Sequence, residues 1–156
     1  MPRATSTTAP ATLTLAPVTG SVPIGTFTAT VSVASPVAVN TPRTIAVTFQ
    51  VQTSFANDVQ PIFTTSCTGC HVSGGDRPVL TAGSSYAAIR GVDPGTGCGP
   101  YVAVGLNTSG SSWLYNKVVA TTPCGGASRM PPGGPFLPAG TSNIIRDWID
   151  EGSPNN

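Results

Sequence analysis

Charge is scarce in this chain and nearly balanced. Of the 156 residues, 7 are Lys or Arg, 6 are Asp or Glu and one is His, which gives a formal net charge of +1. A surface that binds nucleic acid normally carries a basic stripe, and a single lysine with scattered arginines offers none. The composition therefore argues against a nucleic-acid partner.

Long apolar runs are absent as well. No stretch approaches the roughly 18 to 20 apolar residues of a membrane helix, so we expect no transmembrane segment. The chain is instead rich in turn residues, with 18 Gly and 16 Pro, while its 39% hydrophobic content favours a packed chain over a disordered one. We therefore expect folded parts with many turns between their elements.

The charged and sulfur-containing residues are concentrated in the second part of the chain. Only Arg3 and Arg43 are charged before residue 54, and all four Cys, the His and both Trp follow it. We therefore expect a flexible or extended tail over 1–10, a β part over 11–53, a part that carries the chemistry over 54–153, and a short tail over 154–156.

The first part has the alternation of β-strands. Apolar and polar residues alternate over 25–35 and again over 44–51, and a weaker strand is predicted over 11–16, before a turn at 17–20. The apolar members of the two strong strands are Phe27, Ala29, Val31, Val33, Ile45, Val47, Phe49 and Val51. The pattern predicts an all-β, three-stranded sheet with one apolar face.

The phrases Gly20–Phe27 and Pro42–Val47 resemble the last strands of bacterial immunoglobulin-like surface modules, including the BACON type. A whole sandwich of that kind needs about seven strands, so the resemblance implies only a partial sheet. Its apolar face and unpaired edges would be covered by the C-terminal part, by a preceding portion of a longer chain, or by another subunit through strand addition.

The second part carries one specific motif, Cys67-Thr68-Gly69-Cys70-His71. This C-x-x-C-H pattern is the attachment signature of a c-type haem, in which two sulfurs bond to the vinyl groups and the His ligates the iron. A thioredoxin-like dithiol is an alternative, but it calls for a βαβ context that the sequence does not show. A structural zinc site would need Cys98 and Cys124, which form no second C-x-x-C pair.

From about Phe55 to Ser153 the chain resembles a small bacterial mono-haem c-type cytochrome domain of the class I type, with His and Met ligands. The resemblance implies an all-α domain. A helix before the motif is predicted from a cap at Asp58, Pro61 in its first turn and a core-facing Phe63. Further helices are expected to start at Ser84 or Ser85 and at Ser111, and a last one to cover 144–152.

The same resemblance implies the remaining site residues. Arg129-Met130-Pro131-Pro132-Gly133 is similar to the family's Met-Pro-Pro-Gly loop, which makes Met130 the second axial ligand; the alternative is an ordinary buried Met. Pro78 is the candidate whose carbonyl orients His71, and Leu80 the apolar residue that packs on the haem. Arg129, Tyr101 and Trp113 are candidates for binding the haem propionates.

Cys98 and Cys124 remain as an even pair. Haem attachment implies an extracytoplasmic compartment (periplasm, cell surface or extracellular space), where disulfides persist, so we expect these two residues to bond. Free thiols or separate partners are the alternative.

The residues therefore favour electron transfer by one covalently bound, six-coordinate haem c, with redox proteins as partners and without enzymatic activity. A second hypothesis makes the chain a subunit of an extracellular assembly or filament, joined through the incomplete sheet. A third is a haem enzyme or sensor, which would need an open distal position.

Overall fold

The computed structural model of the chain describes residues 3–4, 12–16, 22–105 and 108–156. The chain divides into two units, Met1–Gln52 and Thr53–Asn156, and each is described by itself. Most of the expected 1–10 tail, the first residue of the expected 11–16 strand and the turn at 17–20 lie outside the described residues.

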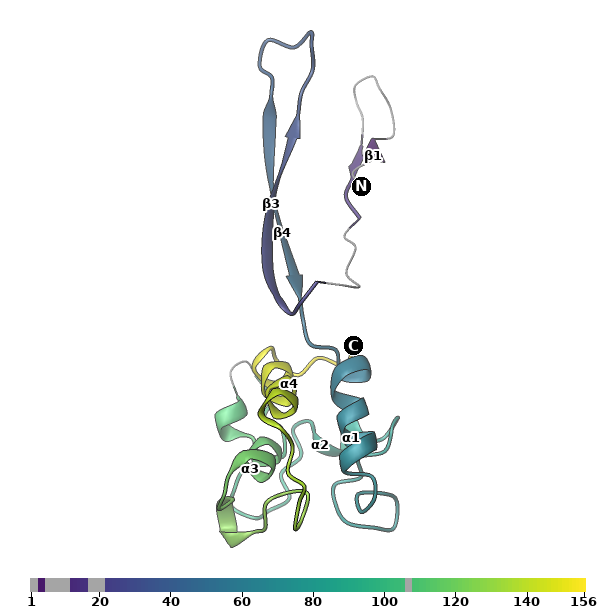
Figure 1. Cartoon of the computed structure of the whole chain (residues 1–156), viewed down its shortest axis with the longest axis vertical. Coiled ribbons are helices and arrows are strands. Elements are labelled where there is room, and N and C mark those ends of the chain that lie inside the picture. Colours follow the sequence, from purple (N-terminus) through teal and green to yellow (C-terminus); the bar gives the residue numbers. More distant parts are fainter. Residues whose placement is uncertain (1–2, 5–11, 17–21, 106–107) are drawn as a thin grey trace. The chain divides into compact units, whose positions relative to one another are not determined.

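The first unit contains one long β-hairpin (Figure 1). Strands β3 (Gly25–Val33) and β4 (Arg43–Val51) pair antiparallel over nine residues each. The register sets Phe27 opposite Phe49 and Thr28 opposite Thr48. Because side chains alternate between the faces of a strand, one face of the hairpin is apolar and the other is lined mainly by Thr and Ser.

The predicted three-stranded immunoglobulin-like sheet is wrong. The expected third strand pairs elsewhere: β2 (Leu13–Thr14) pairs with β1 (Arg3–Ala4), and β3 with β4 forms a separate two-stranded sheet. No residue of β3 or β4 is buried, so the described part of this unit has no sandwich core. Alternation identifies a strand and its faces, but pairing depends on tertiary contacts that the pattern does not contain.

The second unit begins with a single turn of π-helix, η1 (Phe55–Val59), that runs directly into α1 (Gln60–Ser66). Ser54 starts it: its hydroxyl accepts the Asn57 N–H at 3.1 Å, and the Asp58 carboxylate accepts the Ser54 N–H at 2.7 Å. Pro61 lies in the first turn of α1, where the π-helical turn passes into the α-helix.

The remaining helices are short. They are α2 (Ser85–Ile89), α3 (Trp113–Val119) and α4 (Ala139–Asp150), with 3₁₀ turns η2 (Ser109–Ser111) and η3 (Cys124–Gly126). The prediction of an all-α domain is wrong, because long loops separate these helices and Arg90 pairs with Val102 in a parallel β-bridge. Glycines and prolines end the helices after one to three turns.

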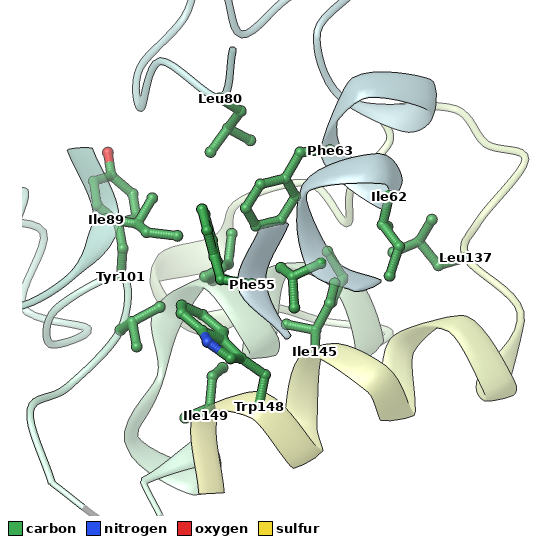
Figure 2. Packing of buried hydrophobic residues seen from close by; sticks show 14 residues of the cluster. Phe55, Ile62, Phe63, Leu80, Ile89, Tyr101, Leu137, Ile145, Trp148 and Ile149 are labelled. Atoms are coloured by element: carbon green, nitrogen blue, oxygen red, sulfur yellow. The ribbon is translucent and has the colours of Figure 1, made fainter. Parts of the chain in front are cut away.

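The hydrophobic core of this unit lies where α1 and α4 meet (Figure 2). The rings of Phe55 and Trp148 have centroids 5.0 Å apart. Trp148 is fully buried and donates its indole N–H to the Pro154 carbonyl at 2.8 Å, so its role is structural. The other fully buried apolar side chains are Val59, Phe63, Ile89, Val102, Ile145 and Ile149.

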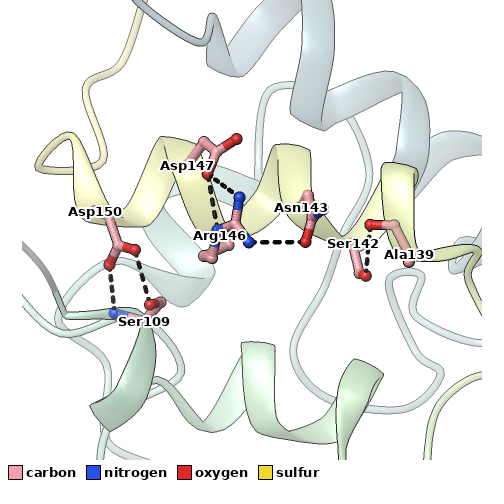
Figure 3. A network of polar contacts seen from close by, with 7 residues as sticks. All are labelled: Ser109, Ala139, Ser142, Asn143, Arg146, Asp147 and Asp150. Carbon is pink, nitrogen blue, oxygen red and sulfur yellow. Dashed lines mark hydrogen bonds and ion pairs between the residues drawn. The ribbon is translucent and has the colours of Figure 1, made fainter.

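Polar contacts hold the ends of the second unit in place. The Thr53 N–H donates to the Glu151 carboxylate at 2.7 Å, and the Phe55 N–H donates to the Asn156 side chain at 2.9 Å. On α4, Asp150 accepts hydrogen bonds from the backbone and the hydroxyl of Ser109, both at 3.0 Å (Figure 3). The last contact connects α4 to the segment that leads into α3.

Candidate functional site: a cleft lined by the C-x-x-C-H motif and Met130

The C-x-x-C-H motif begins where α1 ends. Cys67 is the C-terminal cap of α1, and its N–H donates a hydrogen bond to the Phe63 carbonyl at 2.9 Å. The Cys67 carbonyl in turn accepts hydrogen bonds from the N–H groups of Cys70 and His71, at 3.2 and 3.0 Å. The motif therefore continues the helix as a compact turn. Both thiols are unbonded, Cys67 half-buried and Cys70 exposed.

His71 is held by the loop that follows it. Its carbonyl accepts the Leu80 N–H at 2.8 Å, and its ring Nδ1 lies 3.0 Å from the Pro78 carbonyl oxygen. A carbonyl can only accept, so Nδ1 carries the proton in this contact. That tautomer leaves Nε2 with a free lone pair, the form of imidazole that ligates a metal.

Gln60 supports this loop and was missed by the sequence argument. Its buried side chain donates to the Leu80 carbonyl at 3.1 Å and accepts a short hydrogen bond from the Ser85 hydroxyl. It thereby connects α1 to the His71 loop and to α2. No sequence signal marks it, because a lone Gln in an amphipathic helix has the pattern of a surface residue.

Met130 lies on the loop after α3 and packs, half-buried, against the core. Its N–H donates to the Lys117 carbonyl at 2.8 Å. The Lys117 ammonium in turn donates to the Ser128 carbonyl at 2.6 Å. Met130 and the nearby Ser128 are therefore both hydrogen-bonded to Lys117 of α3.

The motif and Met130 line one cleft, with a cavity volume of about 180 Å³. Pro78 and Leu80 line it as well, so all six predicted cofactor-binding residues lie around the same space. The remaining walls are mostly apolar, and the side chains that form them include Trp113, Leu114, Val118, Pro131, Pro132 and Leu137. These walls bring two thiols, an imidazole and a thioether around one mostly apolar space.

The polar groups of the cleft suit an anion. Arg77 and Lys117 both line it, and burial lowers the pKa of the Lys117 ammonium. Trp113, which stacks on Tyr101 with ring centroids 5.3 Å apart, has a buried indole N–H with no partner among the described residues. Buried donors ordinarily find an acceptor, so this one points to a ligand with acceptor oxygens. An apolar group bearing carboxylates, as haem does, fits the donor set.

The alternatives for the cysteines fit less well. Burial raises the pKa of the Cys67 thiol to about 11, whereas a redox-active dithiol depends on a readily formed thiolate. Cys98 and Cys124 are joined by a disulfide with a Cα–Cα distance of 5.8 Å, so neither is available as a zinc ligand. In the described part of the chain, no three His, Cys, Asp or Glu side chains come together as a metal site.

Comparison of the chain with family models, with curated proteins and with solved structures finds no match. Among the helices described here, none has the length and apolar character needed to cross a membrane. The disulfide is consistent with an oxidising compartment. The functional argument therefore rests on the cleft itself.

Proposed function

We propose that this chain is an extracytoplasmic mono-haem electron carrier, similar to bacterial c-type cytochromes. Cys67 and Cys70 would hold one haem c covalently, with His71 and Met130 as axial ligands. The observation that carries the proposal is the convergence of these four side chains on one cleft in which His71 already has the ligating tautomer. When bound, the haem supplies a one-electron ferric–ferrous couple.

The residues of the chain then have separate tasks. Pro78 orients the imidazole through Nδ1, Leu80 and Leu114 exclude water, and Trp113 offers its unpartnered N–H to a carboxylate. With His71 and Met130 both holding the iron, no position would remain for a substrate, which favours electron exchange with redox proteins over catalysis.

The experiment is a mass spectrum and a visible spectrum of the chain produced in a host that matures c-type cytochromes. We expect one haem per chain. The variant Cys67→Ala/Cys70→Ala should be colourless, whereas the matched control Cys98→Ser/Cys124→Ser should keep its haem. A colourless unmodified protein, or haem retained without Cys67 and Cys70, would contradict the proposal.

A haem enzyme or sensor differs from a carrier at the distal position. Carbon monoxide added to the ferrous protein at neutral pH separates the two functions. We expect no rapid binding if Met130 occupies that position. Rapid binding to the unmodified protein would favour the enzyme or sensor.

A second candidate function is a subunit in an assembly of identical chains. The observation that favours it is the hairpin, whose strands have an apolar face yet contain no buried residue; Phe27 is 37% exposed and Ile45 46%. Isolated two-stranded hairpins are marginally stable in water, so burial against a second copy of the hairpin would stabilise it. This function is compatible with electron transfer.

A further inference from the structure

The loop that carries Met130 also completes the C-terminal end of α3. The last carbonyls of a helix have no partner within it. Here the Lys117 carbonyl accepts the Met130 N–H at 2.8 Å, and the Val118 carbonyl accepts the Arg129 Nε–H at 3.0 Å. The end of α3 and the residues around Met130 therefore form one hydrogen-bonded unit.

Arg129 makes a second contact, on the returning limb of the same loop. Its guanidinium carbon lies 4.4 Å from the centre of the Phe136 ring, within the range of a cation–π interaction. Between the two residues, Gly133 and Gly134 have φ values of 75° and 78°, a left-handed conformation that favours glycine and reverses the chain. Arg129 thus joins α3 to both limbs of the loop.

The positive charge of Arg129 lies next to the C-terminal end of α3. A cation near a helix C-terminus is stabilised by the partial negative charge of the free carbonyls. Of the cations near Met130, Lys117 lines the cleft and Arg129 does not, and no ion pair of Arg129 is found in the described part of the chain. Its guanidinium is directed to Val118 and Phe136 instead of the cleft.

We propose that Arg129 is the positioning residue that holds the Met130 loop against α3, and so controls how readily the thioether leaves its position in the cleft. This inference rests on the proposed function. The planar guanidinium makes both contacts at once: Nε donates to Val118 while the face of the group covers Phe136. A lysine keeps the charge but has no planar face and no Nε–H, so it replaces the contact only in part.

The test uses Arg129→Gln, Arg129→Lys and, as a matched control, Arg146→Gln, which removes a positive charge from the exposed side of α4, outside the cleft lining and the loop. Imidazole is titrated into each ferric protein, and the hydrogen exchange of the Met130 amide is measured in the same samples. Hydrogen bonds to charged groups are among the stronger ones, so we expect Arg129→Gln to bind imidazole about tenfold more tightly. Arg129→Lys should be intermediate and Arg146→Gln unchanged.

The Met130 amide should also exchange faster in Arg129→Gln, a result that does not depend on the colour or potential of the haem. Equal imidazole affinity and amide exchange in all three variants and the unmodified protein would overturn the inference. An equal effect of Arg146→Gln would overturn it too, because charge and not position would then be responsible. Failure of the proposed function is distinguishable, since it would appear in the unmodified protein as missing haem or an open iron.

Discussion

At the scale of single residues, the two proposed axial ligands are held differently. The imidazole of His71 is fixed through its own Nδ1, whereas the structure attaches Met130 through its backbone N–H and leaves the thioether to packing. A thioether is soft and uncharged, so it favours ferrous iron and raises the reduction potential. Met130 is therefore the proposed ligand whose replacement should change the redox properties without removing the cofactor.

Met130→Ala should leave the haem attached, because both sulfur linkages remain. We expect the potential to fall by on the order of 100 mV, within the range of about 0.8 V that axial ligands control, and carbon monoxide to bind the ferrous protein. A redox titration and a carbon monoxide spectrum measure the two effects. The control Met130→His should lower the potential yet still block carbon monoxide, and an unchanged potential in Met130→Ala would show that Met130 is not a ligand.

Gly75 is a second residue with a specific requirement. A Cβ at this position would clash with the backbone carbonyl oxygen of Cys70, which cannot move without distorting the motif, whereas a Cβ at Gly69 meets nothing within 4 Å. Gly75→Ala should therefore reduce haem incorporation and lower the thermal midpoint, and Gly69→Ala should do neither. The haem-to-protein absorbance ratio measures incorporation; equal ratios in the two variants would contradict the prediction.

At the scale of elements, the disulfide connects two loops near the cleft. Cys98 lies in the Gly-rich loop after Asp93, and Cys124 begins η3, six positions before Met130. The Cys124 N–H also donates to the Asn116 side chain on α3 at 2.9 Å. The disulfide therefore adds a covalent tether to a segment that α3 already holds by hydrogen bonds.

Removal of the disulfide should lower the free energy of unfolding but leave the reduction potential unchanged. With a sequence separation of 26 residues, loop-closure entropy predicts a loss of roughly 3 kcal/mol in the free energy of unfolding for Cys98→Ser/Cys124→Ser. Denaturant unfolding of the oxidised protein and the variant measures the difference. Because α3 retains its contacts with the Met130 loop, the potential should stay within experimental error, and a large shift would show that the tether positions Met130.

At the scale of the whole molecule, the second unit has what it needs to fold by itself. Its core, its disulfide and its cleft all lie within Thr53–Asn156. The contacts of Thr53 and Phe55 with Glu151 and Asn156 close its two ends on each other. The hairpin supplies none of the residues that line the cleft.

A chain that begins at Thr53 should therefore keep the visible spectrum and potential of the full chain. Redox titration of both proteins checks this. A loss of haem from the shortened chain would show that the first unit contributes to the site or to its maturation.

If identical chains associate through the hairpin, the full chain should sediment as an oligomer and the shortened chain as a monomer. In the full chain, Phe27→Thr/Phe49→Thr should dissociate the oligomer because it removes an apolar cross-strand pair. The control Thr26→Ser/Gln50→Asn alters the opposite face and should leave the oligomer intact. A monomeric full chain would exclude this assembly.

Local patterns were informative where short-range chemistry decides the outcome. The strand alternation located β3 and β4 to within two residues, and serine caps located the starts of α2 and α3 to within one. The alternation failed for the third strand, since pairing depends on distant parts of the chain, and the all-α domain that the resemblance implied was wrong because helix length depends on tertiary contacts as well. Gln60 was missed, and Arg129 was predicted to bind a haem propionate, whereas it does not line the cleft and its Nε–H donates to the Val118 carbonyl.

The order of residues alone singled out Cys67, Cys70 and His71 through the fixed spacing of the C-x-x-C-H motif, and Met130 through the resemblance of its loop to a Met-Pro-Pro-Gly loop; their role in binding haem stays a prediction. Three further properties were decided only by the tertiary structure. They are that these four side chains line one cleft, which ring nitrogen of His71 is hydrogen-bonded, and which carbonyls of α3 bind the Met130 loop. Those properties arise from tertiary contacts and from the geometry of the loops, and a spacing in the sequence does not encode a distance in space.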